Sequence, residues 1–112
     1  MSAVAWWMAG ELCRGFLPYD GVPIPVGSKS GITEGDFNRV IDQVAVLYEP
    51  YARAAGKELK FHRQWSSPSV NARASRTWTS WIVTLHGGLA RYPGVTADSF
   101  ALVVCHEVGH HV

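Results

Sequence analysis

Long apolar runs and clusters of like charge are both missing from this chain of 112 residues. No stretch reaches the ~20 consecutive apolar residues that a membrane-spanning helix needs, so we expect no transmembrane segment. The ten basic residues are scattered and the formal net charge is +1, which leaves no basic surface for nucleic acid. Charged residues make up 17% and hydrophobic residues 47%, a balance that indicates a folded domain and excludes a disordered chain.

Cysteine is also scarce, and its two copies, Cys13 and Cys105, lie far apart in the sequence. In an oxidising compartment they could form a disulfide, and in a reducing one they would be two buried thiols. The localisation is therefore unknown from sequence. A disulfide would favour export to a periplasm or to the outside, and free thiols would favour the cytoplasm.

Glycine and proline separate an irregular lead-in, residues 1–32, from a core of residues 33–112, and together these form a single domain. Thr33 begins a helix with an acidic first turn, which Pro50 is expected to kink or end. Apolar residues three and four apart predict that one face of this helix is buried. They are Phe37, Val40, Ile41, Val44, Leu47 (or Tyr48) and Tyr51.

Three short strands and a second helix follow in the core. Alternating or β-branched segments at 59–65, 70–77 and 81–86 predict a small, mostly antiparallel sheet of about three strands. Thr96 then begins an apolar helix that we expect to cover 96–112. The order of helix, sheet and helix predicts an α+β fold.

The final helix carries the pattern His-Glu-x-x-His, formed by His106, Glu107 and His110. Histidines four residues apart share one face of a helix and can bind one metal ion, and zinc is the metal that this pattern indicates. Glu107 lies beside that position, where it can take a proton from water. A catalytic zinc has three protein ligands, and we expect the third beyond Val112. The alternative is a surface helix end whose histidines only favour the negative pole of the dipole.

The other three histidines have weaker claims to a site. His111 points about 100° away from His110 on a helix, so we expect it to face solvent or to support a ligand. His86 precedes the Gly-Gly turn at 87–88, where it could complete a metal site or only be hydrogen bonded. His62 is expected to face solvent. The two glycines are expected to provide unusual backbone angles.

An ordered set of segments within residues 59–112 resembles the core of the gluzincin zinc metallopeptidases, in the branch that includes the CAAX prenyl proteases and the membrane-protein quality-control peptidases. The segments are Asn71-Ala72-Arg73-Ala74, Trp81-Ile82-Val83-Thr84, Gly88-Leu89 and the helix with His-Glu-x-x-His. The transmembrane helices of the large members are missing, which suggests a small relative. The resemblance implies peptide-bond hydrolysis, with His106 and His110 as zinc ligands, Glu107 as general base and a glutamate on a later helix as third ligand.

A peptidase of this kind needs an extended peptide or protein substrate held beside the metal, and a sheet edge can hold it by strand addition. Strand 80–86 is our candidate for that edge. The substrate-binding residues that we expect are Asn71, Thr84, His86 and Gly87. With two histidine ligands alone, we expect the chain to be an incomplete peptidase, weakly active or inactive.

Two other functions remain open on sequence grounds. The chain could be a catalytically silent, peptidase-like binding module whose zinc is structural or lost. It could also be half of an assembly, such as a homo-oligomer formed through its C-terminal helix, in which another chain supplies the third ligand. Partner binding without metal would favour the first, and a zinc affinity that depends on protein concentration would favour the second.

Overall fold

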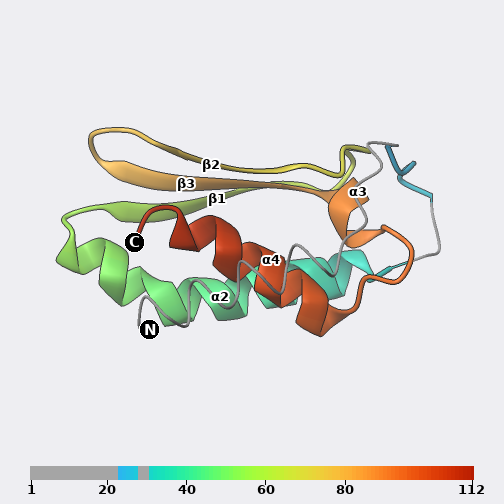
Figure 1. Ribbon diagram of the computed structural model, residues 1–112, viewed down its shortest axis with the longest axis horizontal. Coiled ribbons are helices and arrows are strands. Elements are labelled where there is room, and N and C mark those ends of the chain that lie inside the picture. The colour runs from blue at the N-terminus through green and yellow to red at the C-terminus, as the bar shows by residue number, and fades with distance from the viewer. Residues whose placement is uncertain (1–22, 28–30) are drawn as a thin grey trace.

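Two long helices lie on one face of a three-stranded sheet in the computed structural model, which describes residues 23–27 and 31–112 (Figure 1). The elements follow in the order α2 (Glu34–Ala54), β1 (Glu58–Gln64), β2 (Ala72–Arg76), β3 (Ser80–His86), α3 (Gly87–Ala90) and α4 (Ala97–Gly109). Helix α2 packs beneath β1, and α4 packs against α2, β2 and β3. The α+β fold with three strands is thus confirmed. Among the helices of the described residues, none has both the length and the apolar character that crossing a bilayer requires.

The sheet is mixed, with the strand order β1-β3-β2. Strand β3 pairs antiparallel with β2 and parallel with β1, so the expected mostly antiparallel sheet has one parallel pair. The reason is the place of β3, which forms a hairpin with β2 and then lies between β2 and β1. Because β1 and β2 run in opposite directions, a strand placed between them is parallel to one of them. As the most apolar of the three, β3 takes the position with partners on both sides.

The central position of β3 corrects one expectation about the site. Strand 80–86 is not an edge, because its backbone pairs with β1 on one side and β2 on the other. Within the described part of the chain, the edges of the sheet are β1 and β2. Since α4 packs against β2 and β3, the edge strand that lies over α4 is β2.

Helix α2 begins where the sequence predicts and ends later. The hydroxyl of Thr33 accepts a hydrogen bond from the backbone N–H of Asp36 at 3.1 Å, which caps the first turn. The helix continues through Pro50 to Ala54, so the prediction that it could end at Pro50 is wrong. Pro50 lies on the exposed face, where water can bind the carbonyl that loses its partner. Gly56, with φ of +73°, follows the last turn and reverses the chain.

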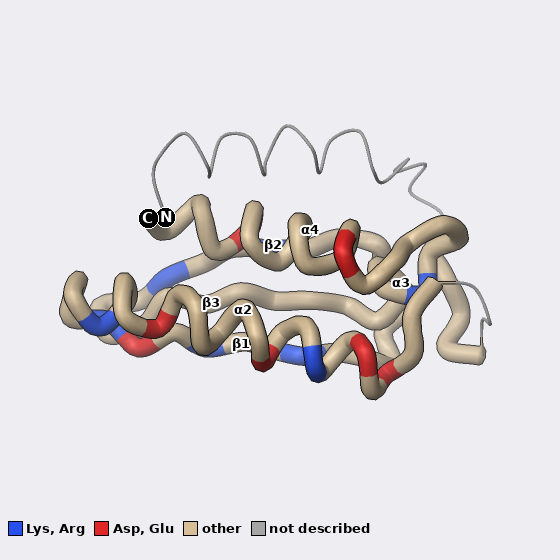
Figure 2. Tube along the Cα trace, turned by 90° about the horizontal axis from the view of Figure 1, so that it is seen from below, with Lys and Arg blue, Asp and Glu red and all other residues tan. Residues whose placement is uncertain are grey.

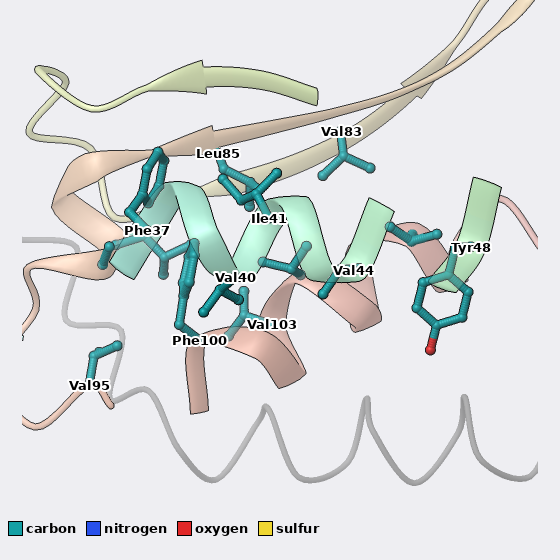
Figure 3. Packing of buried hydrophobic residues seen from close by; sticks show 14 residues of the cluster. Phe37, Val40, Ile41, Val44, Tyr48, Val83, Leu85, Val95, Phe100 and Val103 are labelled. Carbon is teal, nitrogen blue, oxygen red and sulfur yellow. The ribbon is translucent and has the colours of Figure 1, made fainter. Parts of the chain in front are cut away.

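One face of α2 forms the core together with β3 and α4 (Figure 3). Tyr48 takes the buried position rather than Leu47, which is exposed, and Ala52 replaces Tyr51. The rings of Phe37 and Phe100 stack with their centroids 5.3 Å apart, which joins the starts of the two helices. The buried cluster is completed by Val40, Ile41, Val44, Val83, Leu85, Leu89, Ala90, Val95, Val103, Val104 and Val108.

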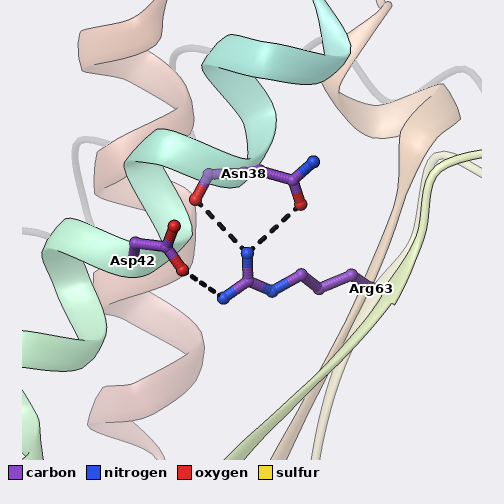
Figure 4. A network of polar contacts seen from close by, with 3 residues as sticks. All are labelled: Asn38, Asp42 and Arg63. Carbon is purple, nitrogen blue, oxygen red and sulfur yellow. Dashed lines mark hydrogen bonds and ion pairs between the residues drawn. The ribbon is translucent and has the colours of Figure 1, made fainter.

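Arg63 joins β1 to the exposed side of α2 (Figure 4). Its guanidinium donates to the carboxylate of Asp42 and, at 3.2 Å, to the side-chain oxygen of Asn38. Contacts from one side chain to two turns of a helix fix the rotation of that helix against the strand. The Asp42 side chain is 66% exposed, so the net stabilisation is small, about 1 kcal/mol or less.

Arg91 is the largest fully buried side chain of the described residues, with 1% of its surface exposed. No carboxylate in this part of the chain forms an ion pair with it. Instead, its guanidinium stacks over the Trp65 ring at 4.7 Å and donates to four backbone carbonyls. These belong to Pro25 (3.0 Å), Ile24 (3.0 Å), Ser67 (3.2 Å) and Trp65. Arg91 thereby joins two segments that have no strand or helix of their own.

Close packing around Arg91 explains the Gly-Gly pair. A Cβ atom on Gly87 would collide with the carbonyl of Trp65 and the guanidinium of Arg91, and one on Gly88 would collide with the carbonyl of Pro68. Neither glycine has a positive φ. The expectation of unusual backbone angles is therefore wrong, and lack of space is the reason for glycine at both positions.

Arg91→Met is expected to lower the free energy of unfolding by about 2–4 kcal/mol, because four partly buried hydrogen bonds to backbone carbonyls are lost. Urea denaturation followed by tryptophan fluorescence measures this. The matched control is Arg39→Met, which removes an exposed ion pair on α2 and should cost about 0.5 kcal/mol or less. Equal effects of the two substitutions would contradict the structural role of Arg91.

Candidate metal centre

Helix α4 places the His-Glu-x-x-His residues at the end of a well-anchored element. Its start has a capping box, in which Thr96 and Ser99 bind each other's backbone N–H groups at 3.2 and 2.9 Å. Phe100, Val103 and Val104 are buried, so the helix is held in the core along its length. It ends at Gly109, with His110 as its C-cap, rather than continuing to Val112 as the sequence predicts.

The side chains of His106, Glu107 and His110 converge at this helix end. Their nearest ligand atoms all lie within 4.8 Å of one another. The two imidazole rings meet edge to face, with centroids 4.7 Å apart. Ligands of a tetrahedral zinc lie roughly 3.3 Å apart, because each is about 2.0–2.1 Å from the ion. Small side-chain rotations would therefore bring both histidines onto one ion, and the donor set fits zinc.

Glu107 is half-buried beside the two histidines. Burial raises the pKa of its carboxyl group above the ordinary value, and the neighbouring His110 offsets part of that rise. A carboxylate with a raised pKa is a better proton acceptor than an exposed one. The environment of Glu107 thus suits the role of a general base.

A third ligand is not found among the described residues. His106, Glu107 and His110 are the only group of three or more potential metal ligands in this part of the chain. Cys105 does not join them. It is a free thiol that interacts with Tyr48, and burial raises its pKa. The disulfide alternative is therefore not realised at Cys105, and Cys13 lies outside the described residues.

His111 faces the sheet rather than solvent. Its Nε2 lies 2.9 Å from the carbonyl oxygen of Ile82, and its ring stacks on Trp81 with centroids 5.5 Å apart and planes 6° apart. Sequence reasoning left open a supporting role for this residue but gave no partner for it. Its contacts with β3 depend on how the sheet packs on α4, and no local pattern encodes that.

The expected substrate-binding residues do not gather around the motif. Thr84 and His86 alternate with the core residues Val83 and Leu85, so they lie on the sheet face opposite the helices. The Nδ1 of His86 is 2.9 Å from the hydroxyl of Ser67, which is the hydrogen-bonded alternative for that residue. Gly87 packs against Trp65 and Arg91. His62 is exposed on β1, as expected.

Asn71 is exposed and immediately precedes β2, the edge strand that packs on α4. Its backbone N–H donates to the Ser69 hydroxyl at 3.2 Å, which fixes the chain as it enters the strand. Asn71 does not lie near the motif: the next residue, Ala72, pairs with Leu85, whereas His111 contacts β3 at Ile82, towards the other end of that strand. The role of Asn71 in substrate binding remains a prediction.

Charges of both signs lie along α2 and β1, whereas α4 carries only the acidic residues Asp98 and Glu107 (Figure 2). The helix that holds the motif therefore has no Lys or Arg side chain that would repel a cation. Asp98 lies at the other end of α4, in its first turn. Glu107 is thus the one carboxylate that the helix places beside the two histidines.

Glu107→Gln is expected to raise the melting temperature of the metal-free protein at pH 7. Because the folded state holds the Glu107 proton more tightly than the unfolded state does, ionisation of this group costs stability as the pH rises above its ordinary pKa of 4.5. The substitution removes that cost. The difference in melting temperature between the variant and the wild type should vanish below pH 4.5. Thermal unfolding in chelator at both pH values measures it, with the exposed Glu58→Gln as control. A variant less stable than wild type at pH 7 would contradict the effect of burial.

Comparisons of the chain with protein-family models, with curated proteins and with solved structures found no significant match.

Proposed function

We propose that this protein is a zinc-dependent peptidase of the gluzincin type, with His106 and His110 as zinc ligands and Glu107 as general base. The observation that carries the proposal is the convergence of these three side chains within 4.8 Å at the end of a buried helix. The ordered sequence resemblance over residues 59–112 supports the same function.

In the proposed hydrolysis, the two histidines and Glu107 have different roles. A zinc ion bound by His106 and His110 would lower the pKa of a coordinated water and polarise the scissile carbonyl. Glu107 would accept a proton from water as the oxygen attacks the carbonyl carbon. When the C–N bond breaks, the same carboxyl group would return that proton to the leaving nitrogen.

The substrate in this proposal is an extended peptide that pairs with β2. Among the described strands, β2 has a partner on one side only, so its other side can accept a further strand. Strand β2 also packs on α4, the helix that carries the motif, which supports this choice of edge. This replaces strand 80–86, whose two sides are both paired.

A third zinc ligand completes the proposed site, and the family resemblance implies a glutamate. The described residues offer none, so the proposal takes this ligand from outside them. Two histidines alone bind zinc weakly, and we therefore expect slow turnover by the 112-residue chain.

The direct test is cleavage of an unfolded protein, such as casein, by the purified chain with saturating zinc. The proposal predicts slow hydrolysis that a chelator abolishes. Glu107→Gln should lower the rate by about 100-fold or more, since it removes the proton acceptor while leaving both histidines. His110→Ala should abolish zinc-dependent cleavage. His62→Ala, which removes an exposed histidine of β1, serves as the matched control.

Cleavage that persists in Glu107→Gln would contradict the proposed mechanism. Zinc binding without cleavage, with a zinc affinity that rises with protein concentration, would instead support an assembly that shares its ligands between chains. Partner binding without metal that survives Glu107→Gln would favour a silent binding module.

A further inference from the structure

The two proposed zinc ligands lie on different backbone, one in the regular helix and one in the turn that ends it. His106 lies within α4, between the fully buried residues Val104 and Val108. His110 is the C-cap, beyond the last regular residue, Gly109. From there on, the backbone bonds are of the shorter type that spans three residues, at 3.3, 3.0 and 3.2 Å for the N–H groups of residues 110–112. Such a terminal turn is prone to fray.

One side chain fastens this terminal turn to the sheet. A carbonyl oxygen can only accept, so the 2.9 Å contact means that Nε2 of His111 carries a proton and donates it to Ile82. The His111 ring also lies flat on Trp81, a residue that is only 6% exposed. Ile82 and Trp81 belong to β3, the strand paired on both sides. The anchor point is therefore the most constrained strand of the sheet.

This arrangement sets the position of His110 through its neighbour. His110 is exposed, and its ring contact in this structure is with His106. The residue next to it, by contrast, is held by a hydrogen bond and a stacked ring. Because the peptide bond joins the two rigidly, fixing His111 restricts the backbone angles from which the His110 ring projects.

We propose that His111 is a positioning residue for the metal centre: its hydrogen bond to Ile82 and its stacking on Trp81 hold His110 where it can share a zinc ion with His106. The inference rests on the proposed function, since it assumes a zinc ion at these two histidines. It assigns His111 no contact with the ion. Removal of a supporting group of this kind typically lowers metal affinity by about 10–100-fold.

The experiment measures zinc affinity by competition with a chromophoric chelator for the wild type, three variants of His111 and the comparison variants His110→Ala and His62→Ala. His111→Ala removes both contacts and should weaken zinc binding by about 10–100-fold. His111→Gln has an amide donor about as far from the backbone as Nε2, so it should restore much of the affinity. His111→Phe retains the ring on Trp81 without the donor and should lie between them. It also replaces the alanine variant should that one fail to fold. His62→Ala is the control for loss of a remote histidine.

A second readout needs no metal. Hydrogen exchange in the chelator-treated protein should show that the amides of residues 110–112 exchange several-fold faster in His111→Ala. Amides in the middle of α4, such as that of Val104, should be unchanged. A general loss of stability would accelerate both sets, so the contrast separates an anchored helix end from a merely weakened fold.

The outcomes separate this inference from the function on which it rests. Zinc binding that is equal in wild type and His111→Ala would overturn the positioning role and leave the metal centre intact. A loss as large as that of His110→Ala, unrelieved by glutamine, would mean that His111 binds the metal itself and would also overturn it. No zinc binding by wild type would overturn the proposed function, and this inference with it.

Discussion

Burial of the apolar side of α4 between α2 and the sheet is the constraint on which the rest of the structure depends. Phe100, at the start of α4, stacks on Phe37 of α2, and Val108, near its end, is fully buried. A helix held at both ends cannot rotate about its axis. The side chains between and beside these two contacts therefore project in fixed directions. His106 and Glu107 are half-buried for that reason, and the carboxyl group of Glu107 has a raised pKa. The chemistry of the motif is thus set by packing as much as by residue type.

Local patterns were sufficient to predict the elements that have strong local signals. Thr33 and Thr96 are the helix caps that the sequence indicates, because a hydroxyl before an amphipathic or apolar segment satisfies free N–H groups. The spacing of His106 and His110 predicted their convergence, since helical geometry alone brings residues four apart together. The α+β order followed from the same periodicities.

Features that depend on distant segments could not be predicted in the same way. The role of Arg91 comes from carbonyls of residues 24–25 and 65–67, which no local pattern joins to it. The helix crosses Pro50 because that side of α2 is exposed, which only the tertiary structure reveals. The order of the strands had an available signal: the apolar run of β3 is typical of a central strand, and the arginines of β2 are typical of an edge. No pattern in the sequence indicated the contact of His111 with β3.

The measurement that tests the metal centre most directly is a zinc titration followed by NMR of the five histidine side chains. Imidazole nitrogens shift strongly on coordination, so each histidine reports for itself. Our account predicts that His106 and His110 change together and saturate as one site, while His62 and His86, which lie on the other face of the sheet, keep their signals. Coordination at His62 or His86, or no change at His106 and His110, would contradict the metal centre and the function built on it.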